Sequence, residues 1–162
     1  MTLEEFLKET SPVLFDGANG SLYQELGIKP GTSPELLNQE NPGLVKQVHE
    51  EYIRAGSMII ETNTFGANRK RLDAAGLEAG IKEINSAAAD IALTAARKKA
   101  FVVGSVGPLG AFVEPYGEVS TQEATDVFAE QVSMLLASGI QFIQIETMMS
   151  LEEAVLALGA AQ

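Results

Sequence analysis

The sequence predicts an α/β fold made of parallel (β/α) units, because strand-like runs and helical patterns alternate along the chain. Apolar runs turn directly into small polar residues at positions 13–20, 57–68 and 142–147. Buried parallel strands are typically continuous apolar runs, and sites in α/β proteins lie at the carboxyl ends of the strands. The three stretches therefore predict one shared site at the carboxyl edge of a sheet.

Helices are predicted by apolar periodicity and by their caps. Thr2 with Glu5 and Ser150 with Glu153 have the spacing of a capping box, and Asn41–Pro42 is a favourable helix start. The predicted helices cover residues 3–9, 21–26, 42–55, 69–75, 81–100 and 122–138, followed by a last helix from Ser150. The predicted strands cover residues 13–15, 57–62, 101–106 and 140–146. Loops are expected at 28–34 and 107–119.

The strand–helix unit occurs four times, with a spacing of about forty residues, whereas a closed TIM-type barrel needs eight units. We therefore expect one domain over residues 1–162 that forms the first four units of an eight-stranded barrel, a half-barrel. Its outer strands would have open edges. Its inward face is expected to use one residue from each of four pairs, namely Val13 or Leu14, Ile59 or Ile60, Val102 or Val103, and Ile143 or Ile145.

Composition excludes several classes of function. Hydrophobic residues make up 46% of the 162 residues and charged residues 20%, as in a soluble globular protein. With 11 basic residues and a formal net charge of −11, the chain is a poor match for nucleic acid or an anionic membrane. The acidic start lacks the pattern of a signal peptide, so we expect a cytoplasmic protein.

The chain has no cysteine and one histidine. Disulfides, cysteine-based zinc sites and thiol nucleophiles are therefore excluded within this chain, and one histidine does not make a metal site. His49 lies in the amphipathic pattern of residues 44–52, and we expect it on a helix surface rather than in catalysis.

An ordered set of motifs resembles the homocysteine S-methyltransferase family, which includes the homocysteine-binding module of cobalamin-dependent methionine synthase and betaine–homocysteine methyltransferase. The motifs are Asp16–Gly17–Ala18–Asn19–Gly20, Asn38–Gln39–Glu40–Asn41–Pro42, residues 61–68 (ETNTFGAN), Gly104–Ser105–Val106–Gly107–Pro108 and Ile145–Glu146–Thr147. Each motif is weak alone, whereas the ordered set is specific.

The resemblance implies a methyl transfer to the homocysteine thiolate that gives methionine. It also implies a zinc ion held by three cysteines in the complete family domain, and a methyl donor such as folate or a cobalamin carried by another module. Since those cysteines belong to the carboxyl-terminal half of the family domain, we expect no catalytic residue and no metal ligand here. The expected role of this half is recognition of the amino-acid end of homocysteine.

Residue by residue, the resemblance places Asp16 and Glu146 at the substrate ammonium and Gly17, Ala18 and Thr62 around its carboxylate. The alternatives are a turn-forming role for Asp16 and a helix-capping or solvated role for Glu146. Possible supporting residues are Glu61, Asn63, Asn68 and Ser105. Thr64 and Phe65 are expected to pack the turn onto the next helix.

Another class of function stays open, namely a non-catalytic half-barrel that acts as a subunit or binding module. It would pair with a second copy or with a separately encoded carboxyl-terminal half. Further modules of a longer chain, or an incomplete product, are also compatible with the sequence. Homocysteine is the expected ligand, and a nucleic acid or a membrane is not an expected partner.

Overall fold

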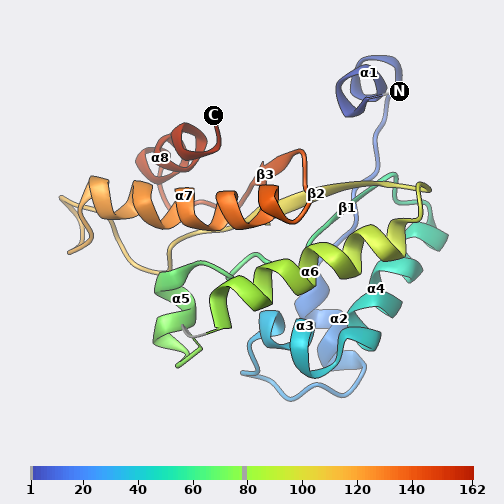
Figure 1. Ribbon diagram of the computed structural model, residues 1–162, viewed down its shortest axis with the longest axis horizontal. Coiled ribbons are helices and arrows are strands. Elements are labelled where there is room, and N and C mark those ends of the chain that lie inside the picture. Colours follow the sequence, from blue (N-terminus) through green and yellow to red (C-terminus); the bar gives the residue numbers. More distant parts are fainter. Residues whose placement is uncertain (1, 78–79) are drawn as a thin grey trace.

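A parallel sheet of three strands forms the centre of the computed structural model, which describes residues 2–77 and 80–162 (Figure 1). The strands are β1 (Ile59–Glu61), β2 (Phe101–Val106) and β3 (Ile143–Ile145), in the order β1-β2-β3. Ile59 pairs with Phe101, and Gly104 pairs with Ile143. The predicted α/β class with parallel strands is confirmed, although β1 and β3 are shorter than expected.

The predicted first strand, residues 13–15, is not formed as a strand. Within it Phe15 makes one isolated parallel bridge to Ile59, and Met58 donates its N–H to the Leu14 carbonyl at 2.8 Å. Pro12 precedes the segment and the Asp16–Gly17 turn follows it, so too few residues remain for a longer ladder. The described sheet therefore has three strands and one bridged segment, and the predicted four-stranded half-barrel is not confirmed.

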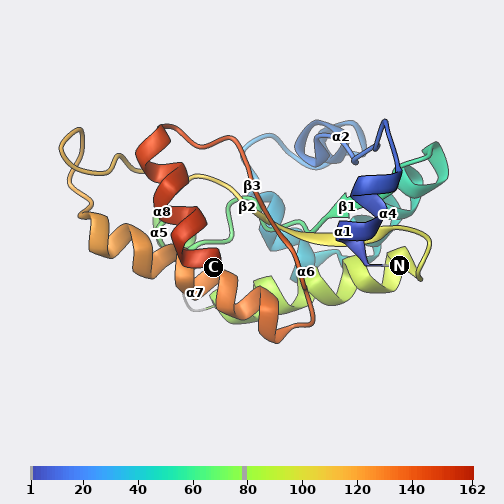
Figure 2. The same cartoon turned by 90° about the horizontal axis from the view of Figure 1, so that it is seen from above.

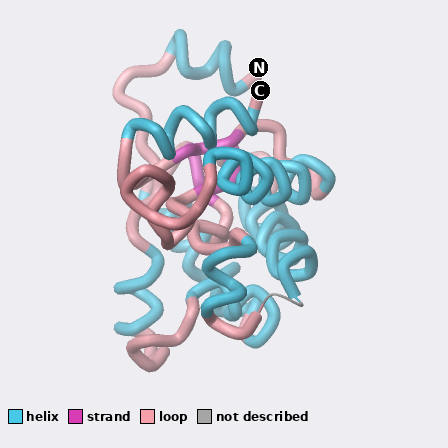
Figure 3. Tube along the Cα trace, turned by 90° about the vertical axis from the view of Figure 1, so that its left-hand side faces the viewer, coloured by secondary structure: helices cyan, strands magenta, loops and turns pink. Residues whose placement is uncertain are grey.

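Helices surround the strands on the outside of the molecule (Figure 3). In chain order they are α1 (Leu3–Glu9), α2 (Asn19–Glu25), the 3-10 helix η1 (Pro34–Leu36), α3 (Leu37–Glu40), α4 (Pro42–Ala55), α5 (Arg69–Ala74), α6 (Ile81–Ala96), α7 (Thr121–Ala137) and α8 (Leu151–Ala161). α4 packs on α6, and α7 packs on α8. The two chain ends lie on the same side of the molecule (Figures 1 and 3).

Several helix boundaries follow the predicted caps. The Thr2–Glu5 capping box is present, the Asn41 side chain accepts from the Leu44 N–H, and Gly56 ends α4 with a φ of 113° that favours glycine. Two helix boundaries were wrong by two residues or more. α2 begins at Asn19 instead of residue 21, and α6 ends at Ala96 instead of residue 100 because Arg97 turns into the left-handed region with a φ of 43°.

The second predicted capping box is only half formed. The Ser150 hydroxyl accepts from the Glu153 N–H at 3.1 Å, as expected for an N-cap. The Glu153 carboxylate does not return to Ser150; it is buried and accepts from the N–H groups of Leu109 at 2.9 Å and Met149 at 2.8 Å. Glu153 thereby ties α8 to the loop after β2.

The surface position expected for His49 was also wrong. Its side chain is 0% exposed on α4, and neither ring nitrogen has a hydrogen-bond partner among the described residues. Burial lowers the pKa of His49 to about 4, so the ring is neutral at physiological pH. His49 lies four residues after Val45 and four before Ile53, so helical spacing places it within the apolar stripe that α4 packs against the rest of the chain.

The sheet has an outer face covered by helices and an inward face that divides into two layers. On the outer face Ile60 and Val102 pack with Ala92 and Ala96 of α6, and Ile143 and Ile145 pack against the cluster of α7 and α8. The lower layer of the inward face is apolar and consists of Val13, Ile59, Phe101, Val103 and Phe142, which pack with Leu3 and Phe6 of α1. The upper layer, towards the carboxyl ends, consists of Phe15, Glu61, Ser105 and Gln144, which line a cavity.

The inward face differs from the expectation in two ways. Neither Ile143 nor Ile145 belongs to it, because the register of β3 places Gln144 there instead. The lower layer is also covered, because Leu3 and Phe6 of α1 pack over it. As a result, Ile59 is 0% and Val103 4% exposed. α1 lies beside the amino-terminal end of β1 (Figures 1 and 2).

Candidate functional site

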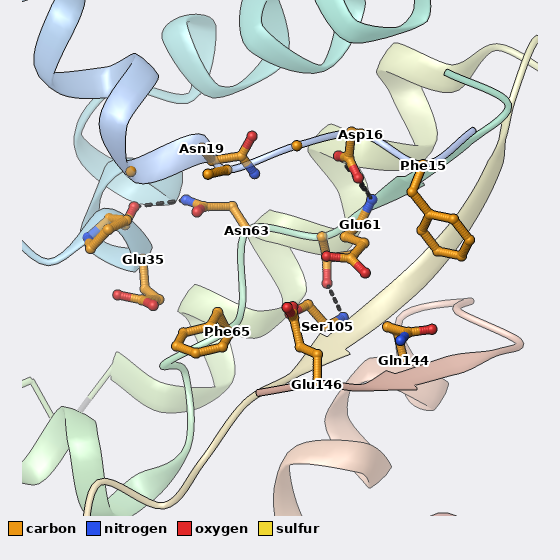
Figure 4. A pocket seen from close by; sticks show the side chains of 15 residues that line it. Phe15, Asp16, Asn19, Glu35, Glu61, Asn63, Phe65, Ser105, Gln144 and Glu146 are labelled. Carbon is orange, nitrogen blue, oxygen red and sulfur yellow. Dashed lines mark hydrogen bonds between the residues drawn. The ribbon is translucent and has the colours of Figure 1, made fainter. Parts of the chain in front are cut away.

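A cavity of about 660 Å³ opens at the carboxyl ends of the strands, where the sequence predicts a site (Figure 4). It lies between the turn after Phe15, the end of β1, the middle of β2 and the end of β3. Its lining residues are Phe15, Asp16, Gly17, Ala18, Asn19, Gly20, Pro34, Glu35, Glu61, Thr62, Asn63, Phe65, Ser105, Gln144 and Glu146. None of these residues is a lysine, an arginine or a histidine, whereas four are carboxylic acids.

Asp16 is fixed to β1 by its carboxylate. The two carboxylate oxygens accept from the N–H of Glu61 at 3.2 and 3.1 Å, and the backbone N–H of Asp16 donates to the Ile59 carbonyl at 3.0 Å. Burial raises the pKa of Asp16 to about 7, against the effect of the backbone hydrogen bonds, and the nearby Glu146 contributes to the rise. The side chain therefore holds a proton for part of the time at neutral pH.

Glu61 and Glu146 complete the acidic cluster. Burial, followed by the charges of Glu146 and Asp16, raises the pKa of Glu61 to about 8. Glu146 accepts from the Ser105 hydroxyl at 2.6 Å (Figure 4), and its backbone N–H donates to the Val106 carbonyl at 3.1 Å, which continues the pairing of β2 with β3. Asp16, Glu61 and Glu146 thus form an acidic cluster in one cavity, and none of the three forms an ion pair with another of the described residues. Such a cluster is suited to a positively charged ligand.

The turn at Gly17 and Ala18 presents backbone donors beside the acidic cluster. None of the described residues accepts a hydrogen bond from the N–H of Gly17 or Ala18, and both residues are exposed. The Tyr52 hydroxyl donates to the Ala18 carbonyl at 3.2 Å and so helps to fix the position of the turn. A Cβ atom at Gly17 would lie 3.0 Å from the Tyr52 Oη, so glycine allows this close approach.

Thr62 and Ser105 link the ends of β1 and β2. The Thr62 hydroxyl accepts from the Ser105 N–H at 3.1 Å and contacts the Thr64 hydroxyl at 2.6 Å, while the Thr62 N–H donates to the Val103 carbonyl. Thr64 donates in turn to the Ser105 carbonyl at 2.7 Å. Both polar groups of Thr62 are thus engaged within the protein, and its expected contact with a ligand carboxylate stays a prediction.

Asn63 and Asn68, the two asparagines of the motif at residues 61–68, lie in different places. Asn63 lines the cavity, and its Nδ2 donates to the Pro34 carbonyl at 2.7 Å and to Asn38 Oδ1 at 2.9 Å. Asn68 lies away from the cavity lining; it caps α5 and donates to the Pro108 carbonyl at 3.0 Å. The structure therefore brings together Asp16, Gly17, Ala18, Thr62, Glu146, Glu61, Asn63 and Ser105 and leaves out Asn68.

Glu35, Gln144 and Phe65 line the cavity without having been proposed for it. Glu35 is buried in η1, where it accepts from the Gly66 N–H at 2.7 Å and from the Ser33 hydroxyl at 2.6 Å. Phe65 was expected only to pack, and Arg71 lies 5.5 Å above its ring centroid. The alternation of Gln144 with Glu146 along one strand was the signal that could have revealed Gln144.

The described residues do not fit a metal centre. Among residues 2–77 and 80–162, no group of three histidine, cysteine, aspartate or glutamate side chains has the geometry to hold a metal ion. The chain also lacks the cysteines that the family resemblance implies for zinc. In the same part of the chain, the helices are too short or too polar to cross a membrane.

Two solved structures with a similar fold are of a homocysteine methyltransferase. The oxidised form of MmuM from Escherichia coli superimposes with a TM-score of 0.80 at 26% identity, over 98% of this chain and 61% of that chain. The metallated form of the same protein gives a TM-score of 0.80 at 25% identity over 98% of this chain and 62% of that chain.

Sequence comparison points to the same group of proteins. The chain is 32% identical to betaine–homocysteine S-methyltransferase 1 of Mus musculus, over 96% of this chain and 39% of that protein. It is 30% identical to methionine synthase of Mycobacterium leprae (strain TN), over 75% of this chain and 11% of that protein. The chain thus spans well under half the length of these two relatives. The sequence profile described as homocysteine S-methyltransferase matches residues 13–162, and this chain belongs to that family.

Proposed function

We propose that this chain supplies the amino-acid-recognition part of a homocysteine S-methyltransferase site. The observation that carries the proposal is the convergence of Asp16, Glu61 and Glu146 in one cavity that has no basic lining residue. In the complete protein, the methyl group would be transferred to the thiolate of homocysteine, which gives methionine.

The acidic cluster accounts for recognition of the ammonium group. An ammonium ion has three N–H donors, and charge-assisted hydrogen bonds to carboxylates are the stronger kind. Asp16 and Glu146 would accept from it directly, with Glu61 beside them. Because the pKa values of Asp16 and Glu61 are raised in the free protein, a bound cation would favour their ionised forms and release protons.

The exposed N–H groups of Gly17 and Ala18 account for recognition of the carboxylate. They lie next to Asp16 in the chain, so one α-amino acid could reach both kinds of partner at once. Thr62, Asn63 and Ser105 would position the site: Ser105 holds Glu146, and Asn63 holds the Pro34 end of η1. Asn68 would act only indirectly, through α5, which it caps, and through the loop at Pro108, to which it donates.

The sulfur end of the substrate requires chemistry that these residues do not provide. A thiol has a pKa near 8.5 and attacks as the thiolate. Because the residues present do not fit a metal ion, we assign no step to one within this chain, and no residue of this chain to the methyl donor. Folate, cobalamin and betaine remain the donors that the family resemblance suggests for the complete protein.

A role as a binding module is the second candidate, and an exposed apolar stripe on α8 favours it. Leu151 is 81%, Val155 57% and Leu158 51% exposed, and these residues recur at helical spacing on one side of the helix. We propose that this stripe and the free edge of β3 accept further (β/α) units, from a longer chain, a complementary half-barrel or a second copy. The assembled protein would act in the cytoplasm.

Calorimetry with homocysteine and with its analogue lacking the amino group, 4-mercaptobutyrate, tests the main proposal. We expect measurable binding of homocysteine and at least tenfold weaker binding of the analogue. Glu146→Gln should weaken homocysteine binding, whereas Glu152→Gln on the exposed side of α8 should not. Equal binding of the two ligands, or an unchanged affinity in Glu146→Gln, would contradict the proposal. Methionine should bind about as well as homocysteine if this chain does not recognise the sulfur.

A further inference from the structure

A second cavity, of about 720 Å³, lies at the opposite, amino-terminal ends of the strands. It is formed where α1 approaches the end of α4 and the turn between α6 and β2 (Figures 1 and 2). Its lining residues are Phe6, Ile53, Gly56, Ser57, Met58, Lys98, Lys99, Ala100 and Phe101. Its volume is in the range of small-molecule sites, about 300–1,000 Å³.

The lining of this amino-end cavity is amphipathic. Phe6, Ile53, Met58 and Phe101 supply an apolar surface, and the rings of Phe6 and Phe101 have their centroids 5.0 Å apart. Met58 is 36% exposed, so part of that surface is in contact with water. A ligand that covers it would gain about 25 cal/mol for each Å² of apolar area removed from water.

Lys98 and Lys99 give the cavity a positive charge. Both side chains are exposed, and neither forms an ion pair with an acidic group in the described part of the chain. The neighbouring Arg97, by contrast, lies 3.8 Å from Glu50. In a chain with 22 acidic and 11 basic residues, two adjacent lysines without an acidic partner form a local site for an anion.

The backbone places these lysines at the cavity rather than in the helix. α6 ends at Ala96, and the left-handed conformations of Arg97 and Lys98, with φ of 43° and 63°, turn the chain towards β2. The Lys99 N–H donates to the Ala96 carbonyl at 2.7 Å, and the Phe101 N–H donates to the Met58 carbonyl at 2.9 Å. The two lysines are thereby held between the helix end and the apolar floor.

We propose that the amino-end cavity binds a small amphipathic anion, a carboxylate with an unbranched apolar tail. The tail would lie against Phe6, Met58 and Phe101, and the carboxylate would face Lys98 and Lys99. The ligand is a free molecule rather than an anionic membrane surface, because the net charge of −11 repels such a surface. This site lies at the other end of the strands from Asp16 and Glu146 and is independent of the proposed methyltransferase function.

Octanoate is the probe, and amide NMR spectra of the full chain report where it binds. We expect saturable shifts at residues 98–101 and at Phe6, with a dissociation constant of about 1 mM or tighter. Across hexanoate, octanoate and decanoate, each added CH₂ that is buried should raise the affinity about fourfold. 1-Octanol, which lacks the charge, should bind at least tenfold more weakly than octanoate.

The double variant Lys98→Ala/Lys99→Ala should lose about tenfold in octanoate affinity and keep its weak affinity for 1-octanol. The matched control Lys29→Ala/Lys82→Ala removes the same charge from exposed positions that do not line this cavity and should bind octanoate like the parent. Because all four lysines are exposed, we expect the variants to fold, and circular dichroism checks this. Equal affinity in the two double variants, no preference for octanoate over 1-octanol, or shifts confined to other residues would overturn the proposal.

Discussion

The two layers of the inward face use the same strands in opposite ways. In the lower layer, Ile59 and Val103 pack under Leu3 and Phe6 of α1, and water is excluded. In the upper layer, Glu61 and Ser105 occupy the equivalent alternate positions and face a cavity with Asp16 and Glu146. A step of two residues along β1 thus leads from Ile59, in the layer that stabilises the fold, to Glu61, in the layer where carboxyl groups are partly buried without a cation. We infer that the lower layer holds the candidate site in place.

The largest expected effect comes from opening the lower layer. Ile59→Ala removes a fully buried side chain between β1 and α1 and should lower the free energy of unfolding by about 2–5 kcal/mol. Urea unfolding measures the change. Leu14→Ala, a control on the bridged segment next to β1 at a position that is 52% exposed, should cost less than about 1 kcal/mol. Equal losses in the two variants would contradict the layered description.

His49 is a buried ionisable group on α4, and its removal should change the pH dependence of stability. The pKa of His49 is about 4 in the folded chain and about 6.5 when unfolded, so the unfolded state binds more protons between these values. The parent protein should therefore lose stability as the pH falls from about 6.5 to 4. His49→Leu should gain stability relative to the parent over that range, on the order of 3 kcal/mol in total.

Urea unfolding of the parent and His49→Leu at several pH values provides the measurement. Because His49 is the single histidine, the difference between the two proteins isolates this titration from that of the carboxyl groups. A difference that stays constant between pH 4 and 6.5 would show that the ring is not buried in its neutral form.

In the upper layer, removing a charge should stabilise the fold. The folded-state pKa of Glu61 is raised from 4.5 to about 8, so its contribution to stability is present below pH 4.5 and is lost as the pH rises towards 8. Glu61→Gln imitates the protonated form and should be more stable than the parent at pH 8 by about 1 kcal/mol, since solvent in the open cavity screens the effect.

The control for Glu61→Gln is Glu152→Gln, at an exposed position of α8. Its unfolding free energy should follow that of the parent at pH 5 and at pH 8. If the unfolding free energy of Glu61→Gln also follows that of the parent at both pH values, the partly buried acidic cluster does not destabilise the fold. The contrast between the two layers would then be wrong.

The smallest effect is expected for Ser105→Ala. This variant removes the 2.6 Å hydrogen bond that holds Glu146, and it should change stability by no more than about 1 kcal/mol. Homocysteine affinity should fall about three- to tenfold, because Glu146 would no longer be held in one position. Calorimetry of Ser105→Ala and Ser105→Thr checks this, since the threonine hydroxyl should restore part of the affinity. No loss in Ser105→Ala would remove Ser105 as a positioning residue.

The sequence predicted the features that depend on local chemistry. Caps such as Thr2 and Asn41 act within a few residues, and the polar residues after β1 and β3 meet because parallel strands align their carboxyl ends. Most of the proposed site residues line the cavity for that reason. The family resemblance supplied the expected roles of these residues, and the profile match confirmed the family.

The features that escaped prediction depend on contacts far apart in the chain. The cover that α1 provides for Ile59 follows from how the helices pack, which the local pattern does not contain. Glu35 reaches the cavity through its bond to the Gly66 N–H, 31 residues away in sequence. The exclusion of Ile143 and Ile145 from the inward face follows from the register of β3, and a shift of one residue exchanges the two faces.

The most direct test of the ammonium site is the titration of its carboxyl groups by NMR. With ¹³C-labelled side chains, Asp16 should titrate near pH 7 and Glu61 near pH 8 in the free protein, because both are buried without a cation. Saturation with homocysteine should lower both pKa values, whereas 4-mercaptobutyrate should leave them unchanged. If Asp16 and Glu61 titrate below pH 5 in the free protein, or if neither responds to homocysteine, the assignment of this cavity to the ammonium group is contradicted.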